Sequence, residues 1–300
     1  RAFTGWTYPP RPGVATRFPN PPHYLGRMVP FAAQHDTAQK VLFGNRTIPA
    51  GQTPEKDLND AIDAIFNNAN VGPFVGRQLI QHLVTSNPTP AYVSRVTAAF
   101  NNNGAGVRGD MRAVLRAILL DPEARGDVKT AADYGKLREP ALLLANVMRA
   151  LNGSSDGVFL FGQSSSMGQN VFQPPSVFNF YPPNYPAPGT TIDGPPFKLM
   201  LTGTILNRAN FVDRIVFGAN VNPDSTVTGA TGTRINLQPF QSLAATPDQL
   251  LDRLNLILMH NTLSPQARQA ILTAVNAYPA TDTLGRVRQQ IPVLVDRAPL

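Results

Sequence analysis

The feature that most constrains the fold is a serine or threonine followed by proline, placed just before a run of periodic apolar residues. It occurs at Thr53-Pro54, Thr89-Pro90, Thr246-Pro247 and Ser264-Pro265. A hydroxyl oxygen at the N-cap accepts a hydrogen bond from a free backbone N–H, and proline at the first helical position gives up no needed donor. Each of these dipeptides therefore predicts the start of an α-helix.

Apolar residues recur after these and similar start points at the spacings of one helical face. The expected faces are Leu58, Ile62, Ile65 and Phe66; Phe74, Val75, Leu79, Leu83 and Val84; Tyr92, Val93, Val96 and Phe100; Val114, Leu115, Ile118 and Leu119; Leu250, Leu251, Leu254, Ile257 and Leu258; and Ala267, Ile271, Leu272 and Val275. Further helices are predicted over 140–151, 197–217 and 284–295. The fold class is therefore all-α, or mainly α, as a single irregular multi-helix domain spanning residues 1–300.

Two proline-rich stretches interrupt this helical pattern. Residues 1–50 lack regular periodicity and are expected to form a coat that docks its aromatic side chains on the helices. Residues 171–188 read VFQPPSVFNFYPPNYPAP, which is too rich in proline for a central strand and too aromatic for a flexible linker. The predicted order is thus a coat over 1–50, helices over 53–151, an ordered loop over 152–196, and helices over 197–300.

Composition narrows the classes of partner and site. The chain carries 26 Lys and Arg against 19 Asp and Glu, but these charges are spread along it rather than gathered in a basic run, which argues against a nucleic-acid partner. The absence of cysteine excludes disulfides and thiolate metal sites. No apolar stretch reaches the roughly 18 residues that a membrane span needs, so this fragment is expected to hold no transmembrane segment.

His35, Asp36 and Lys40 are the candidate catalytic residues. An imidazole beside a carboxylate is able to bind a divalent metal or act as a general base, which makes His35 and Asp36 the candidate metal ligands as well. A metal normally takes about three or four ligands, and the spacing of His23 matches no known ligand pattern. The alternative is that the three candidates form a buried, hydrogen-bonded and ionic anchor for the N-terminal coat.

A second group of polar and aromatic residues supplies the candidates for binding. They are Lys136, Arg138, Gln169, Phe178, Asn179 and Tyr181. Lys136 and Arg138 precede a helix that starts with proline, where they would either hold an anion or serve a structural role. The aromatic loop would form either a stacking platform for a sugar or peptide, or a cover over the core with Phe178 turned inward.

The order of these motifs resembles a known family. The chain opens with Arg-Ala-Phe-Thr-Gly-Trp and continues with the spaced set of His35, Asp36 and Lys40. Lys-x-Arg-Glu-Pro follows at 136–140, Met-Gly-Gln at 167–169, and Phe-x-Pro-Pro-Ser-Val-Phe-Asn-Phe-Tyr at 172–181. This order resembles the C-terminal two-thirds of the bacterial "domain of unknown function 1800" family (DUF 1800), so the chain is expected to be a fragment of a longer family domain.

The resemblance implies a mainly helical, exported protein, periplasmic or secreted, of unknown function. It also implies a partner, an exported sulfatase-like protein of the "domain of unknown function 1501" family. The family offers no established catalytic residues, and Gln78 stands where many members have lysine. Two functions follow as hypotheses. One is a binding or scaffold role with that exported partner, and the alternative is an extracytoplasmic metal-dependent hydrolase centred on His35 and Asp36. The cofactor stays open.

Overall fold

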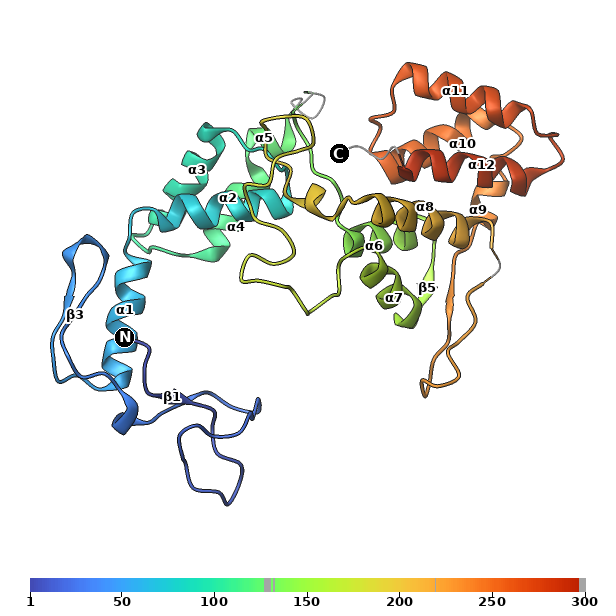
Figure 1. Ribbon diagram of the computed structural model, residues 1–300. Helices are drawn as coiled ribbons and strands as arrows, with labels where there is room; N and C mark the ends of the chain where they lie inside the picture. Colours follow the sequence, from blue (N-terminus) through green and yellow to red (C-terminus); the bar gives the residue numbers. More distant parts are fainter. Residues whose placement is uncertain (127–130, 132, 219, 297–300) are drawn as a thin grey trace. The chain divides into compact units, whose positions relative to one another are not determined.

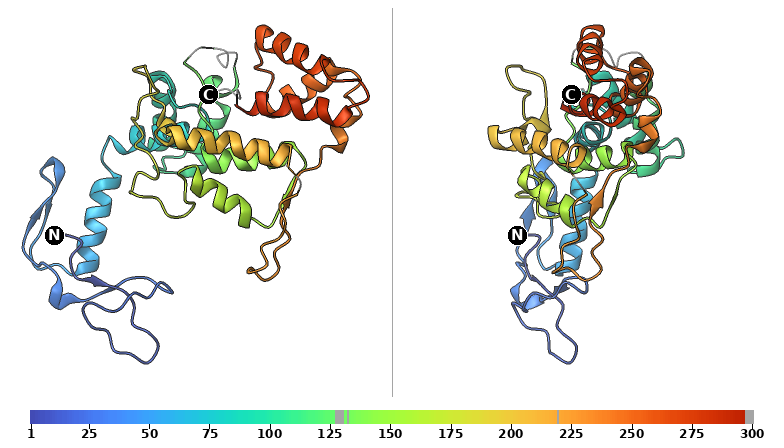
Figure 2. Two further views of the ribbon diagram at one scale, coloured as in Figure 1. Left: turned by 45° about the vertical axis from the view of Figure 1, so that its right-hand side comes forward. Right: turned by 90° about the vertical axis from the view of Figure 1, so that its right-hand side faces the viewer.

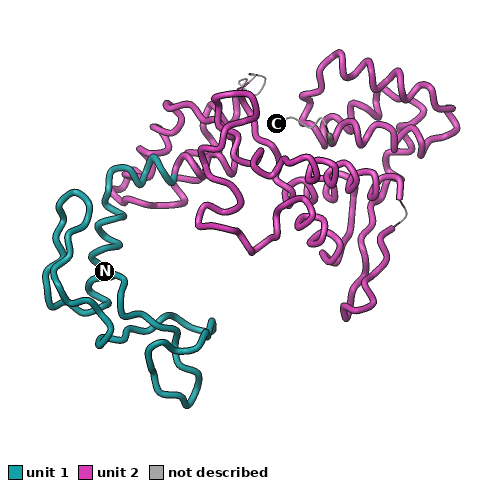
Figure 3. The backbone as a smooth tube through the Cα atoms, viewed as in Figure 1, with its two compact units in different colours: residues 1–75 teal, residues 76–300 magenta. Residues whose placement is uncertain are grey.

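The computed structural model describes residues 1–126, 131, 133–218 and 220–296 (Figure 1). Helices are the main regular structure of the described residues, and the strands are two residues long, which confirms the mainly-α prediction. Contacts divide the chain into two compact units, residues 1–75 and residues 76–300, which we call unit 1 and unit 2 (Figure 3). The boundary falls inside helix α2 (Val71–Leu83).

Unit 1 contains two short antiparallel strand pairs and one long helix. Strand β1 (Trp6–Thr7) pairs with β2 (Val29–Pro30), and β3 (Lys40–Val41) pairs with β4 (Thr47–Ile48). Two 3₁₀ turns, η1 (Ala32–Gln34) and η2 (Phe43–Asn45), separate these strands, and α1 (Pro54–Phe66) follows. Six prolines lie between β1 and β2, where they cannot donate to a ladder, which keeps that pairing short.

Helix α1 packs through a different face from the one expected. The predicted stripe includes Ile62 and Ile65, but these side chains are exposed. The buried positions are instead Asp57, Ala61 and Ala64, with Pro54 at the start of the helix. Ala61 packs in a small core with Ala2, Ile48 and the half-buried Leu42. Small side chains on α1 let β4 and the N-terminal segment approach closely, and a charged group on the same face requires partners there.

Unit 2 begins with a group of short helices. These are the remainder of α2, α3 (Pro90–Asn101), α4 (Met111–Leu120) and α5 (Pro122–Arg125). Helix α3 packs on α4 through Tyr92, Val96 and Phe100, three residues of its predicted face. The Tyr92 hydroxyl donates to the carbonyl of Ile118 at 2.6 Å, so its polar end is satisfied inside the core.

The rest of unit 2 holds the larger core. Its elements are α6 (Pro140–Ala150), β5 (Ser154–Ser155), α7 (Val158–Ser166), η4 (Pro195–Leu199), α8 (Thr202–Val216), β6 (Thr233–Arg234), α9 (Gln238–Gln241), α10 (Pro247–Leu254), the π-helical turn η5 (Asn255–Met259), α11 (Pro265–Asn276) and α12 (Thr283–Asp296). Helices α10, α11 and α12 lie side by side, and α12 also packs on α8 (Figures 1 and 2). Among the described residues, no helix combines the length and apolar character needed to cross a membrane.

The predicted helix starts are confirmed in position. Thr53, Thr89 and Ser264 each accept a hydrogen bond from a backbone N–H in the first turn. Helix α10 also begins at Pro247, but Thr246 makes no cap with its side chain. Its hydroxyl donates instead to the Leu243 carbonyl at 3.3 Å. Proline at the first position is therefore sufficient here for the start of the helix.

Helix α7 lies within the stretch that was expected to be an ordered loop. It has no serine- or threonine-proline start, and Gly157 occupies its N-cap in the left-handed region without a side-chain cap. Support comes from a distant segment, because Asp156 accepts hydrogen bonds from Val158 N at 3.0 Å and from Gly232 N at 2.6 Å. A helix held by a contact 76 residues away in sequence leaves little local signal.

Candidate functional site

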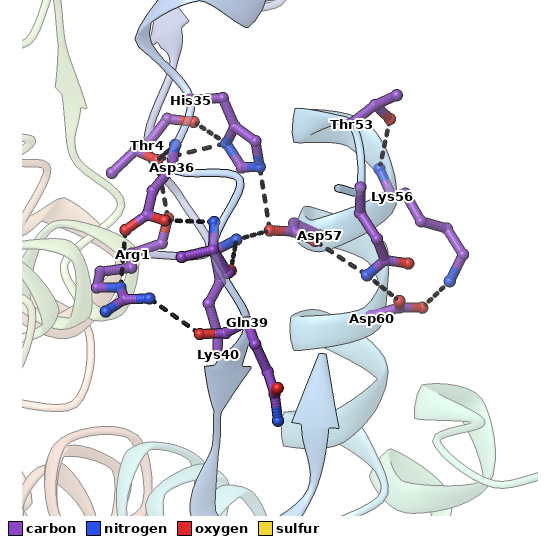
Figure 4. Close-up of polar contacts among 12 residues, drawn as sticks. Arg1, Thr4, His35, Asp36, Gln39, Lys40, Thr53, Lys56, Asp57 and Asp60 are labelled. Carbon is purple, nitrogen blue, oxygen red and sulfur yellow. Dashed lines mark hydrogen bonds and ion pairs between the residues drawn. The ribbon is translucent and has the colours of Figure 1, made fainter. Parts of the chain in front are cut away.

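The candidate cluster in unit 1 joins His35 and Lys40 to Asp57, a residue of α1 (Figure 4). Nε2 of His35 lies 3.0 Å from Oδ2 of Asp57, and Nζ of Lys40 lies 2.5 Å from the same oxygen. The three side chains are 1%, 4% and 0% exposed. Gln52 donates to the other carboxylate oxygen at 3.0 Å, so both oxygens of Asp57 are engaged. Paired and hydrogen-bonded in this way, the buried carboxylate has the partners that burial of a charge requires.

The N-terminal segment holds His35 from its other side. The carbonyl of Thr4 lies 2.9 Å from Nδ1, and since a carbonyl only accepts, Nδ1 is the donor. Gly5 permits this approach, because it has φ +75° and a Cβ there would lie 3.0 Å from the Cα of His35. The second nitrogen faces Asp57, so neither ring nitrogen is open to solvent.

Asp36 points away from this cluster (Figure 4). Its carboxylate pairs with Nε of Arg1 at 2.7 Å and accepts a hydrogen bond from the backbone N–H of Ala38 at 2.8 Å. The sequence neighbours His35 and Asp36 are therefore not brought together, and Asp57 takes the place that was expected for Asp36. His23 is also elsewhere, with Nδ1 3.3 Å from the carbonyl of Pro9.

Sequence reasoning missed Asp57. An acidic residue in the first turn of a helix is ordinarily an exposed partner of the helix dipole, and Glu55 has the same local setting. The only sequence signal for Asp57 is its position beside Ala61 and Ala64 on the small-residue face of α1. That face is recognisable as the buried one only after β4 and the N-terminal segment are in place.

Electrostatics keep Asp57 ionised. Burial acts to raise the pKa of Asp57, but the hydrogen bond and charge of Lys40, together with Gln52 and His35, outweigh it and lower that pKa. Lys40 is held in turn by the carbonyl of Ala38 at 2.9 Å. The described residues contain no group of three or more His, Asp or Glu placed to hold a metal ion. The arrangement is a closed ionic anchor between the N-terminal segment and α1.

We expect acid to weaken unit 1 through Asp57. Because its folded-state pKa lies below the unfolded value, its stabilisation is present above about pH 3.9 and is lost as the pH falls through the lower folded-state pKa. Trp6, the single tryptophan, lies in unit 1, so its fluorescence in urea reports on this unit within the full chain. The urea midpoint should fall between about pH 5 and pH 2, and the Asp57→Asn variant should show a shallower fall. An equal fall in both would contradict this role.

A second cluster lies in unit 2 at the start of α6, where Glu139 accepts two hydrogen bonds at one oxygen. Gln169 Nε2 donates to Oε2 at 2.8 Å, and the Tyr181 hydroxyl donates to it at 2.7 Å. Gln169 also accepts from the backbone N–H of Ala141 at 2.8 Å, which caps α6 in place of an N-cap side chain. Burial, then the hydrogen bond and charge of Glu139, raise the pKa of the Tyr181 hydroxyl. The cluster joins α6 to both ends of the segment between Gln169 and Tyr181.

The other binding candidates take separate places. Lys136 donates to the carbonyl of His82 at 2.5 Å, and burial lowers the pKa of Lys136. Arg138 donates to the carbonyl of Leu258 at 3.2 Å, and its Nη2 lies 3.0 Å from Nε2 of His260. Both cations therefore bind protein groups. Phe178 and Asn179 lie in the turn that follows Ser176, and the side chain of Phe178 is exposed.

Comparison with known proteins supports the motif evidence. A family described as "protein of unknown function (DUF1800)" matches residues 1–294. Comparison with curated proteins finds no match, and comparison with solved structures finds none. The family motifs contribute directly to the two clusters, through His35 and Lys40 in unit 1 and through Glu139, Gln169 and Tyr181 in unit 2. The match over nearly the whole length shows that this chain belongs to the DUF1800 family, whose function is unknown.

Proposed function

We propose that this chain is a binding or scaffold protein that docks an exported protein partner through the loop over 171–188. The observation that carries the proposal is the exposure of two large apolar side chains on this loop, Phe172 and Val177, each 95% exposed. Large apolar side chains presented together on a surface mark interaction sites, and aromatic residues dominate the binding energy of many interfaces.

The loop is held in shape close to these two side chains. Tyr181 and Gln169 tie its flanks to Glu139. Between them, the backbone N–H of Asn179 donates to the carbonyl of Ser176 at 3.1 Å, which closes a turn around Val177. An ordered loop loses little conformational entropy on binding, which favours recognition.

Backbone strain in this loop also supports a binding role. Phe172 and Asn179 both have φ +66°, a region that costs a residue with a side chain about 1–2 kcal/mol. Asparagine tolerates this region, whereas phenylalanine rarely occupies it. In Phe172 the strain accompanies a side chain that is almost fully exposed, so burial within this chain does not offset it.

Net charge and the family resemblance support this choice of partner. The chain has a net charge of +7, so an acidic surface around an apolar pocket would complement it and speed encounter. From the family resemblance we infer that the partner is an exported sulfatase-like protein of the "domain of unknown function 1501" family and that the complex forms outside the cytoplasm. The hydrolase alternative stays a prediction, and the closed cluster around Asp57 gives it no support.

The test uses a purified sulfatase-like protein of that family and the full chain. We expect the Phe172→Ser, Val177→Ser double variant to bind about 10- to 100-fold more weakly by calorimetry, with an unchanged circular dichroism melt. Val227→Ser, at an exposed valine in another loop of unit 2, is the matched control and should bind as the wild type does. The proposal fails if the two proteins do not bind, or if the double variant and the control bind alike. Loop-dependent dimers seen by light scattering would assign the loop to a second copy instead.

A further inference from the structure

A cavity of about 410 Å³ lies in unit 2 between the end of α8, the segment from β6 to α9, and α12. Buried apolar side chains, among them Val216 and Leu237, form part of its lining. Exposed polar residues, among them Arg234, Asn236 and Gln238, also line it. Its volume is within the range of about 300–1,000 Å³ that is usual for small-molecule sites. Apolar walls with a few polar groups are the ordinary composition of such a site.

Arg288, on α12, lines this cavity and is half-buried. Its Nε atom is buried and has no hydrogen-bond partner among the described residues. Arg286, two residues earlier, shows how the same helix treats a structural arginine. The Arg286 guanidinium donates to the carbonyl of Tyr278 at 2.9 Å and 3.1 Å and to that of Ala244 at 3.1 Å. An arginine keeps its charge at any physiological pH, and a buried N–H without an acceptor is costly to the protein alone.

The charge on the cavity lining is of one sign. Arg234 and Arg288 are its charged residues, and the described lining includes no carboxylate. Arg234 uses Nε to donate to Ser154 Oγ at 3.1 Å and is otherwise exposed. A guanidinium binds carboxylate or phosphate through two parallel hydrogen bonds, and an anion in the cavity would supply the acceptor that Arg288 Nε lacks.

We propose that this cavity binds a sugar-sized organic anion, a hydroxylated ring that carries one phosphate or carboxylate group. Arg288 and Arg234 pair with the anionic group. The side-chain amides of Asn236 and Gln238 both donate and accept, which suits ring hydroxyls. Val216 and Leu237 contact the apolar face of the ring. The cavity does not include the loop over 171–188, so the inference does not rest on the proposed partner.

Calorimetry with the full chain tests the ligand class. The probes are glucose 6-phosphate, glucuronate, glucose and inorganic phosphate. At least one anionic sugar should bind about tenfold or more tightly than glucose and inorganic phosphate. Binding of glucose 6-phosphate alone assigns the phosphate group, and binding of glucuronate alone assigns the carboxylate. Failure of both anionic sugars at about 10 mM, or equal binding of glucose or inorganic phosphate, overturns the proposal.

Variants test the residues. Arg288→Gln should weaken binding of the anionic sugar about tenfold or more, while the melting temperature without ligand stays level or rises because an unpaired buried donor is removed. Arg234→Gln, at an exposed position, should weaken it several-fold without unfolding the chain, and it decides the test if Arg288→Gln does not fold. Arg253→Gln, on an exposed position of α10, is the control and should bind normally. Wild-type affinity in both Arg288→Gln and Arg234→Gln would sink the proposal.

Discussion

The Asp57→Ala variant is expected to lose about 3–5 kcal/mol of the free energy of unfolding of unit 1, the largest effect we predict. Removal of this carboxylate leaves the buried His35 and Lys40 without their shared acceptor, and Gln52 with Asp60 as its remaining acceptor. The cost is that of leaving the Lys40 cation buried without its counter-ion, which far exceeds the net worth of the pair itself. The His35–Thr4 contact then has no counterpart on α1, so the N-terminal segment should detach early.

Urea denaturation of the full chain, followed by Trp6 fluorescence, measures this loss. Glu55→Ala is the matched control on the same helix. Glu55 is exposed in the first turn of α1, and its removal should cost about 0.5 kcal/mol or less. Far-UV circular dichroism of the same samples should show the helices of unit 2 melting as in the wild type. If Asp57→Ala costs no more than Glu55→Ala, the cluster is not the anchor of unit 1.

The second large effect is expected at Glu139, whose replacement by alanine should destabilise unit 2 by about 3 kcal/mol. Two buried donors, the Tyr181 hydroxyl and the Gln169 amide, lose the same acceptor oxygen. A hydrogen bond to a charged acceptor contributes about 1.5–3 kcal/mol, and two that share one oxygen contribute less than their sum. Gln169 also caps α6, so its release should fray the first turn of that helix.

Chemical denaturation followed by circular dichroism at 222 nm gives the readout. Asp213→Ala, at an exposed position of α8, is the control and should change the stability of unit 2 by about 0.5 kcal/mol or less. A double-mutant cycle with Tyr181→Phe should return a coupling of about 1–2 kcal/mol between Glu139 and Tyr181. Additive single effects would mean that the hydroxyl and the carboxylate do not support each other.

Local patterns predicted much of the helical framework. Pro54, Pro90, Pro247 and Pro265 begin helices as expected, because the capping bond and the fixed proline φ act within one turn. The faces of α10 and α11 are also buried largely as predicted, since these helices pack in a dense core where apolar periodicity and burial coincide. On α1 they do not coincide, because a buried charge and two alanines form its packed face.

Local sequence patterns did not predict which charged and polar groups pair with one another. His35 meets Asp57 across 22 residues rather than the adjacent Asp36, and Glu139 meets Tyr181 across 42. The hydrogen bonds of Arg286, and the missing acceptor at Nε of Arg288, depend on which carbonyls the fold brings to each side of α12. No pattern along the chain separates these two arginines.

The sequence by itself determined the helical class, the helix starts and the family, because these depend on residues within a few positions of one another or on the order of motifs along the chain. Only the tertiary structure decided which face of α1 is buried and which acid holds His35 and Lys40. It also decided which arginine of α12 lines the cavity with an Nε atom that lacks an acceptor. The physical reason is that burial and electrostatic pairing are set by segments far apart in sequence, and their partners exist only after the chain has folded.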